Sequence, residues 1–224
     1  MTPSVKAWMW LVALAIVMGA LIFGAAADLR FWQGWTFLAV FFGASSLITQ
    51  YLIANDPALL ERRVRGGPTE ETEPTQKLIM VFVSFGFVAL IVVPGLDHRF
   101  GWSQAPAVVA LAGGALIAVG FFVVFLVFKA NSFASSTIGV AEGQTVVSTG
   151  PYAIARHPMY AGAFVYLVGT PLALGSYWGL AVVALMAPFL MWRLVDEERV
   201  LEQRLPGYSD YKRKVRYRLL PGVY

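Results

Sequence analysis

The chain of 224 residues contains no cysteine and only two histidines, His98 and His157. Without cysteine it has no disulfide framework, no thiol nucleophile and no cysteine-based metal site. The two histidines fall on opposite expected faces of a membrane, so a histidine-rich metal centre is excluded as well. The sequence therefore predicts no bound metal.

Charge is also scarce: 13% of the residues are charged, 58% are hydrophobic and the mean hydropathy is +0.66. Soluble domains carry about 25% charged residues, and about 20 apolar residues cross a bilayer. Uncharged apolar runs occur at 8–27, 32–54, 78–96, 105–128, 160–174 and 177–195. Segments that cross hydrocarbon must satisfy their own backbone groups, so these runs predict helices.

The expected fold is therefore an all-α, polytopic integral membrane bundle of about six transmembrane helices, with the fifth and sixth forming a helical hairpin. The run 160–174 is short and contains Gly162, Gly169 and Pro171, which also suits a tilted or half-buried hairpin arm. Small residues at 43–46 ("GASS") suit close packing between helices.

The first run could instead be a signal peptide, because "GAAAD" at 24–28 resembles a cleavage site. We favour a membrane span, because Lys6 is the only charge before the run and the run has the length of a span.

The distribution of basic residues predicts the orientation. With six crossings and the N-terminus inside, 15 of the 17 lysines and arginines fall on the inner side, and only Arg30 and Arg99 fall outside. Both termini, the 55–77 loop and the 129–157 loop are then cytoplasmic, as expected for an inner (plasma) membrane protein. The net charge of +4 suits contact with anionic membrane lipid, and no nucleic-acid-binding motif is present.

No soluble nucleotide-binding domain is expected either, because no P-loop and no strand followed by G-x-G-x-x-G occurs. Residues 1–130 form plain N-terminal transmembrane helices, and the polar motifs lie in the second region, 131–224. The loop 55–77 mixes both charge signs with glycine and proline, which indicates a solvated loop with a short interfacial helix.

The segment 131–152 is rich in Ser, Thr and Gly and lacks a helical period, and loops of this length are usually functional or disordered. Its end, "GPY", predicts a tight turn, with Pro151 presetting the turn. Next, in "RHPMY", Pro158 suits the first turn of a helix, whose free N–H groups favour a carboxylate. Alternatively, Arg156 and His157 are interfacial anchors among lipid headgroups.

Along "MWRLVDEERVLEQRL" (191–205), Arg193 and Glu197 share one helix face, and Glu198 and Glu202 repeat that spacing. Arg193 lies at the inner edge of the last span, where an ionisable group is a functional candidate. A solvated helix end with i,i+4 ion pairs is the simpler alternative. The three polar pieces share one side of the membrane, so the topology predicts a polar pocket that opens to the cytoplasm.

Together, "GQTVVSTGPYAIARHPMYAG", "RLVDEERVL", "PGYSDY" and "RYRLLPGVY" resemble the isoprenylcysteine carboxyl methyltransferase family, which is related to membrane phospholipid methyltransferases. The resemblance covers residues 131–224. It implies an all-helical membrane enzyme that uses S-adenosyl-L-methionine.

The resemblance also implies roles for individual residues. It assigns Glu197 to the cofactor pocket and Arg193 to the acceptor. By the chemistry of its guanidinium, Arg193 suits a carboxylate or a lipid phosphate, and Arg156 is a second candidate for either. Thr137 falls where the family can place a polar cofactor contact. Gln144 stands where family members often have histidine, so we do not expect a base there. The further cofactor-binding residues that it implies are Gln144, Thr145, Val146, Val147, Tyr152, His157, Pro158, Met159 and Tyr160.

An arginine orients a carboxylate through paired hydrogen bonds, and a carboxylate needs no base at neutral pH. We therefore expect carboxyl O-methylation of an isoprenylcysteine-like or other amphiphilic carboxylate that enters from the inner leaflet. Three alternatives stay open: a phospholipid amine N-methyltransferase, an NADPH-dependent sterol-reductase-like enzyme that uses the basic segment 212–218, and a non-enzymatic scaffold. That segment is also typical of an inner-leaflet anchor, and the tail 218–224 is expected to pack back on the membrane domain.

Overall fold

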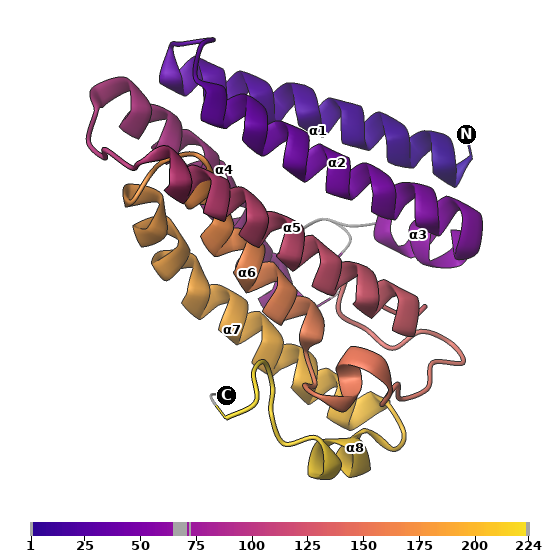
Figure 1. Ribbon diagram of the computed structural model, residues 1–224. Helices are drawn as coiled ribbons and strands as arrows, with labels where there is room; N and C mark the ends of the chain where they lie inside the picture. Colours follow the sequence, from indigo (N-terminus) through magenta and orange to yellow (C-terminus); the bar gives the residue numbers. More distant parts are fainter. Residues whose placement is uncertain (1, 65–70, 72, 223–224) are drawn as a thin grey trace.

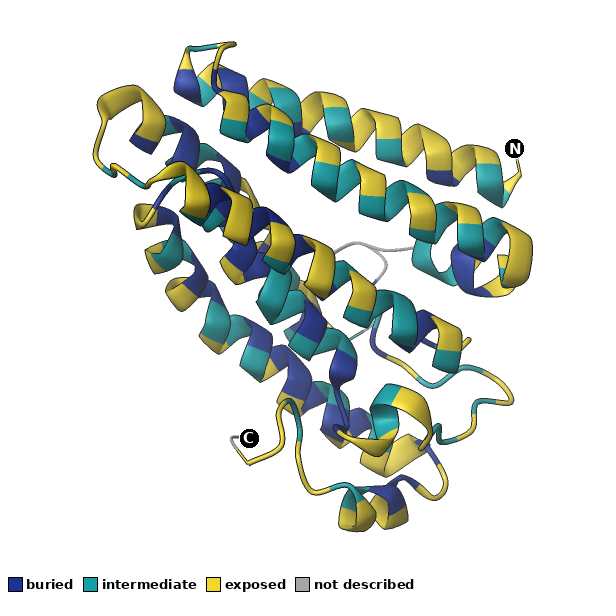
Figure 2. Cartoon of the chain, in the orientation of Figure 1, coloured by how far each residue is buried: buried dark blue, intermediate teal, exposed yellow. Residues whose placement is uncertain are grey.

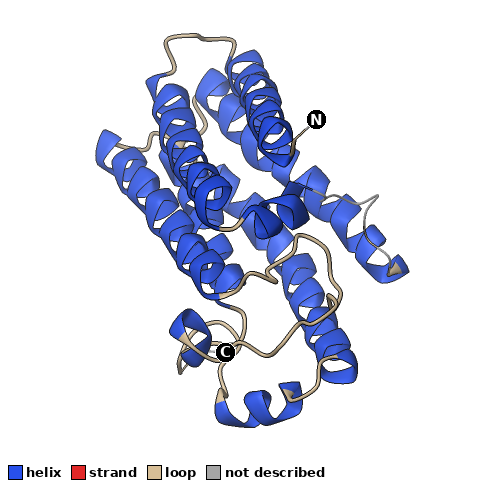
Figure 3. Cartoon of the chain, turned by 90° about the vertical axis from the view of Figure 1, so that its right-hand side faces the viewer, coloured by secondary structure: helices blue, strands red, loops and turns tan. Residues whose placement is uncertain are grey.

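The computed structural model describes residues 2–64, 71 and 73–222 (Figure 1). In the described ranges no residue lies in a strand (Figure 3), so the expected all-helical class is confirmed. The helices, in chain order, are α1 (Pro3–Ala26), α2 (Trp32–Asn55), α3 (Pro57–Val64), α4 (Pro74–Phe100), α5 (Ala107–Ala130), the 3-10 helix η1 (Gly150–Ala153), α6 (Pro158–Ala173), α7 (Trp178–Arg204) and α8 (Tyr208–Lys214).

Five helices are long and apolar enough to cross a membrane, namely α1, α2, α4, α5 and α7. The remaining expected span, the fifth in chain order, is α6, which has 16 residues. At 1.5 Å per residue it is about 24 Å long, shorter than the hydrocarbon core of about 30 Å. It packs against α7 after the short turn 174–177 and is the shorter arm of the expected hairpin.

The outer surfaces of α1 and α2 are exposed (Figure 2), and many of the exposed side chains are large and apolar. Trp10 and Ile16 of α1 are each 67% exposed, and Leu47 of α2 is 74% exposed. Large contiguous apolar surfaces of this kind are rare on soluble proteins, so these faces are suited to contact with lipid.

The tightest packing is between α5 and α6. A Cβ atom added at Gly113 would lie 2.2 Å from the backbone nitrogen of Ala173, and one added at Gly120 would lie 2.6 Å from the carbonyl oxygen of Gly162. Small residues bring membrane helices together in this way. At Gly43, by contrast, no described atom lies within 4 Å of an added Cβ, so the close packing expected at 43–46 is absent at that glycine.

The connecting segments gather at two ends of the bundle (Figure 1). The turns 27–31, 101–106 and 174–177 lie at one end, and the loop 131–149, η1 and α8 lie at the other. The short helix expected in the 55–77 loop is α3. Residues 65–70 and 72 of that loop, Arg65 among them, lie outside the described residues, as do residues 223–224 of the tail.

Candidate active site

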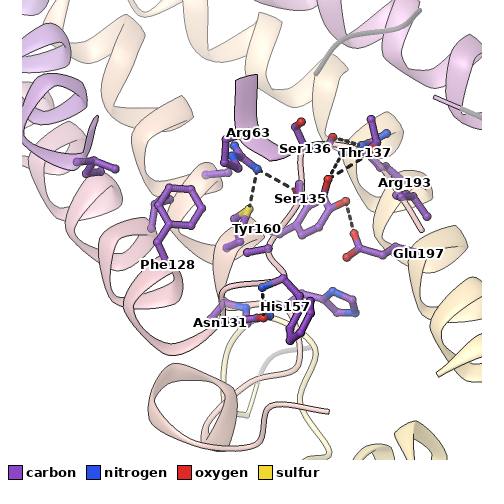
Figure 4. Close-up of a pocket in the computed structure, with 18 of the residues that line it drawn as sticks. Arg63, Phe128, Asn131, Ser135, Ser136, Thr137, His157, Tyr160, Arg193 and Glu197 are labelled. Carbon is purple, nitrogen blue, oxygen red and sulfur yellow. Dashed lines mark hydrogen bonds between the residues drawn. The ribbon is translucent and has the colours of Figure 1, made fainter. Parts of the chain in front are cut away.

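A cavity of about 810 Å³ lies between the N-terminal helices and the polar segments that follow residue 131. Helices α1, α2, α4 and α5 give it an apolar wall, which includes Trp10, Leu52, Phe87 and Phe128. Its polar wall comes from the loop 131–149, the start of α6 and the last turns of α7 (Figure 4). One cavity therefore joins an apolar space between helices to a cluster of charged groups.

The loop 131–149 is fixed at both of its ends. At the first end, Asn131 Nδ2 donates to Tyr152 Oη at 3.0 Å, and Asn131 Oδ1 accepts from the backbone nitrogen of Phe133 at 2.9 Å. At the second end, Gly150 has a φ of 57° and Pro151 lies in the first turn of η1, which confirms the predicted tight turn. Burial raises the pKa of Tyr152 to about 12, so its hydroxyl stays neutral.

Helix α6 begins at Pro158, as predicted, with His157 as its N-cap residue. In the first turn of this helix, Tyr160 Oη donates to Glu197 Oε2 of α7 at 2.8 Å (Figure 4). This bond joins two residues that the resemblance assigns to cofactor binding, one on α6 and one on α7. The imidazole of His157 is buried, and its Nε2 has no hydrogen-bond partner among the described residues, although Glu198 Oε1 lies 3.5 Å away.

Glu198 is the acidic partner of Arg156 and Arg218. Its Oε1 accepts from Arg156 Nε at 2.5 Å, and its Oε2 accepts from Arg218 Nε at 2.8 Å. Arg156 Nη1 also donates to the carbonyl oxygens of Val215 and Arg216 at 2.8 and 2.7 Å. Because these groups are buried, the alternative of an interfacial anchor is wrong for Arg156 and His157.

The tail 215–218 packs against the start of α6 through backbone bonds. The nitrogen of Arg156 donates to Tyr217 O at 3.0 Å, and the nitrogen of His157 donates to Arg218 O at 2.8 Å. The expectation that the tail 218–224 packs back on the membrane domain is confirmed at Arg218.

Arg193 is held by the protein rather than by solvent. Its Nη2 donates to Glu71 Oε1 at 2.6 Å and to Ser136 O at 3.0 Å, and its Nη1 donates to Gln76 Oε1 at 2.7 Å. Arg193, Glu71 and Glu198 are all buried, so the alternative of a solvated helix end is wrong for this part of α7. An acceptor-binding role for Arg193 stays a prediction, and its described contacts are with protein groups.

Arg63 and Glu71, both in the segment predicted as a solvated loop, were missed by the sequence reasoning. Arg63 lines the cavity from α3, and its Nη1 donates to Ser135 O at 3.0 Å (Figure 4). Its guanidinium also lies over the ring of Phe128, 5.0 Å from the centroid. Burial lowers its pKa, but an arginine starts so far above neutrality that it stays charged. The only signal in the sequence was the excess of arginine in "ERRVR".

Every residue that the resemblance assigned to the site lies on the wall of this one cavity. The loop and η1 contribute Gln144, Thr145, Val146, Val147 and Tyr152. The start of α6 and the two residues before it contribute Arg156, His157, Pro158, Met159 and Tyr160, and α7 contributes Arg193 and Glu197. Thr137 lies there too, whereas the side chain of Gln144 accepts a hydrogen bond from the nitrogen of Ala141 at 2.9 Å within its own turn. Their individual roles stay predictions.

Comparison with known proteins gives three matches. Residues 108–206 match the phospholipid methyltransferase family. A nickel-cobalt-cadmium resistance protein, NccN of Alcaligenes xylosoxydans xylosoxydans, is 29% identical over 133 residues, which cover 52% of this chain and 62% of that protein. The protein-S-isoprenylcysteine O-methyltransferase of Schizosaccharomyces pombe is 33% identical over 76 residues, which cover 31% of this chain and 30% of that enzyme.

The matched family region contains most of α5, the polar loop 131–149, α6 and all of α7, and therefore most of the polar wall of the cavity. The chain spans less than two thirds of the length of either relative. This region of the chain is therefore similar to membrane methyltransferases, both to the phospholipid methyltransferase family and to a protein-S-isoprenylcysteine O-methyltransferase.

Proposed function

We propose that this protein transfers a methyl group from S-adenosyl-L-methionine to an amphiphilic carboxylate drawn from the inner leaflet of the membrane. The observation that carries the proposal is the cavity of about 810 Å³, which joins a charged wall to an apolar wall. A water-soluble methyl donor and a lipid-soluble acceptor can meet in such a space. The family match supports a methyltransferase in general and leaves the acceptor to be identified.

The groups on the polar wall fit the donor. The carboxylate of Glu197 has Tyr160 as its hydrogen-bond donor and can accept from ribose hydroxyls or offset a cationic group. Two buried polar atoms at the same cavity, His157 Nε2 and Tyr208 Oη, lack partners among the described residues, which costs about 1–3 kcal/mol each. The first N–H groups of α6 are suited to the donor's amino-acid carboxylate.

Glu197, Tyr160 and the start of α6 would hold S-adenosyl-L-methionine, which would supply a sulfonium methyl group for in-line displacement by the acceptor's carboxylate oxygen, with the electron pair of the broken sulfur–carbon bond going to sulfur. No proton moves, because the acceptor is already ionised at neutral pH. The protein's part is to hold donor and acceptor in line at short distance and to keep water away. Side chains on the polar wall orient the donor, and the apolar helices hold the tail of the acceptor.

A phospholipid amine is the second candidate acceptor, because the matched family is that of phospholipid methyltransferases. An amine must lose a proton before it attacks, so it would need a base that a carboxylate does not need.

The two remaining alternatives have less support. A phosphate of NADPH would have to compete for the basic segment 212–218, where Lys212 pairs with Glu202, Arg213 with Asp210, and Arg218 with Glu198. A scaffold would bind no cofactor.

The first experiment is calorimetric titration of the detergent-purified protein with S-adenosylhomocysteine. We expect micromolar binding that weakens about tenfold or more in Glu197→Gln and in Tyr160→Phe, because a hydrogen bond to a charged group is worth about 1.5–3 kcal/mol. Glu202→Gln is the matched control on the same helix, since Glu202 is exposed and pairs with Lys212. No binding by folded wild-type protein would overturn the proposal and make NADPH the next titration.

The class of acceptor can be read from the product. Membranes that contain the protein are incubated with S-adenosylmethionine tritiated in its methyl group, and the lipid extract is treated with alkali. A methyl ester releases volatile methanol under alkali, whereas an N-methyl group keeps its label. We expect volatile tritium, and label that resists alkali would support the amine acceptor instead.

A further inference from the structure

The cavity has four basic side chains on its wall, and three of them face a carboxylate. Arg156 and His157 face Glu198, and Arg193 faces Glu71. Arg63 is different: among the described residues no carboxylate pairs with it, and its contacts are Ser135 O, the sulfur of Met159 and the ring of Phe128.

The hydrogen bonds of Arg63 use one edge of its guanidinium. Nη1 makes both described hydrogen bonds, to Ser135 O at 3.0 Å and to Met159 Sδ at 3.9 Å. A guanidinium carries five N–H donors, so the Nε and Nη2 donors remain without a described partner. Two neighbouring donors of this kind match the two oxygens of a carboxylate.

The position of Arg63 suits the head of an amphiphile. It projects from α3 at the point where the polar wall, Ser135 and Tyr160, meets the apolar wall, Phe128 and Leu60 (Figure 4). An acid group held there leaves its tail beside the apolar side chains of α1, α2 and α5.

The charged side chains on the cavity wall fall into two groups, those in ion pairs and those outside them. Once Arg156, Arg193 and their glutamates are paired, the charged side chains left on the described wall are the Arg63 guanidinium and the Glu197 carboxylate. Glu197 suits a cationic partner and Arg63 suits an anionic one.

We propose that Arg63 binds the carboxylate of the methyl acceptor through its Nε and Nη2 donors and so selects acidic amphiphiles over neutral or cationic ones. This inference rests on the proposed methyltransferase function for the reaction that follows, but acceptor binding can be measured without turnover. Arg193, which the sequence favoured for this duty, then acts as a structural partner of Glu71 and the loop 131–149.

The test measures equilibrium binding of radiolabelled hexadecanoate and of hexadecanol to the full chain in nanodiscs. The two probes share one tail and differ in their charge. We expect saturable hexadecanoate binding that weakens about tenfold or more in Arg63→Gln, with hexadecanol binding little changed. Arg63→Lys keeps the charge but loses the paired donors, so its loss is expected to be intermediate.

Arg62→Gln is the matched control. Arg62 is the neighbour of Arg63 on α3, donates to Ser132 O at 2.8 Å in the same loop and lies over the ring of Phe133, but it is not on the cavity wall. It therefore loses the same kind of anchor to the loop, and we expect both probes to bind it as they bind the wild type.

Several outcomes would overturn the assignment of Arg63: unchanged hexadecanoate affinity in Arg63→Gln, an equal loss for both probes, or no saturable hexadecanoate binding by the wild type. Titration with S-adenosylhomocysteine is run in parallel. Its loss in Arg63→Gln alone would place Arg63 on the cofactor and also overturn the assignment. Its absence in the wild type would overturn the methyltransferase proposal, while hexadecanoate binding would still decide the role of Arg63.

Discussion

Glu198 is the acid that holds the segment before α6 and the C-terminal segment together. Its side chain is 4% exposed and its partner Arg156 is 6% exposed, so neither charge is solvated in the fold. Removing one partner of a buried ion pair leaves the other uncompensated, which is far costlier than losing an exposed pair.

We therefore expect Glu198→Gln to lower the free energy of unfolding by about 3–5 kcal/mol, because Arg156 and Arg218 lose their carboxylate. Thermal unfolding in detergent measures this change. Glu202→Gln removes an exposed pair with Lys212 from the same helix and is expected to cost less than about 1 kcal/mol. Equal effects of the two substitutions would contradict the role given to Glu198.

Buried tyrosines near the C-terminal segment predict how stability depends on pH. Burial raises the pKa of Tyr152 to about 12, and burial also raises the pKa of Tyr208 and of Tyr211. Above pH 10 the unfolded chain loses these protons first, since an unperturbed tyrosine titrates near about 10. The folded state then binds more protons than the unfolded state, so stability falls as pH rises.

We expect the unfolding temperature to be steady between pH 7 and 9 and to fall from about pH 10 to about pH 12. A pH series of thermal scans measures it. Tyr152→Phe removes one of the groups and should make the fall less steep. A slope identical to that of the wild type would show that Tyr152 does not contribute.

At the scale of the helix, the contact between α5 and α6 depends on glycine. A Cβ at Gly120 would lie 2.6 Å from the carbonyl oxygen of Gly162, and backbone cannot move aside as a side-chain end can. At Gly114, on the same helix, the nearest atom to an added Cβ is Val40 Cγ2 at 4.0 Å. The two positions therefore make a matched pair.

Gly120→Ala is expected to lower the free energy of unfolding by about 1–3 kcal/mol through overpacking, and Gly114→Ala to change it by less than about 0.5 kcal/mol. Thermal unfolding of the two variants side by side checks this. Because we propose that the start of α6 binds the cofactor, Gly120→Ala should also weaken S-adenosylhomocysteine binding. If both variants unfold like the wild type, the close approach of α5 and α6 is wrong.

The boundaries of the elements were predictable where a local rule applied. Pro158 begins α6 and Gly150 opens η1, because proline and glycine restrict or free the backbone within one turn. Pairings between distant segments were not predictable in this way. Arg193 pairs with Glu71, which lies 122 positions away, and not with Glu197 on its own helix face.

The candidate site was predictable as far as its motif extends. The residues assigned by resemblance after 131 all lie on one cavity wall, whereas Arg63 and Glu71 come from the segment 55–77, which the resemblance does not cover. The spacing of residues along the sequence does not show which distant loop packs beside the site. Only the packing of α3 beside the loop 131–149 shows that contact.

For the whole molecule, the distribution of basic residues predicts that the end of the bundle holding the cavity faces the cytoplasm. The absence of native cysteine makes this easy to test, because a single introduced thiol is the only reactive one. Glu142 and Gln104 are exposed at opposite ends of the bundle and suit the substitution to cysteine.

We expect an impermeant maleimide added outside intact cells to label Gln104→Cys and to leave Glu142→Cys unlabelled until the membrane is opened. Labelling of Lys6→Cys should follow that of Glu142→Cys. The reverse labelling pattern would show that the membrane orientation is opposite to the predicted one, with the cavity on the outer face.

The backbone bonds from Arg156 and His157 to residues 217 and 218 also have a consequence for biosynthesis. A ribosome makes residues 156 and 157 long before residues 217 and 218. The last long apolar helix, α7, is made between the two pairs, and the other long apolar helices are made before both. Until residues 217 and 218 have been made, the backbone N–H groups of Arg156 and His157 lack the carbonyl oxygens that they bind in the folded protein. These bonds can therefore form only after the last span has been synthesised, so a prematurely terminated chain should insert in the membrane without the methyltransferase activity proposed above.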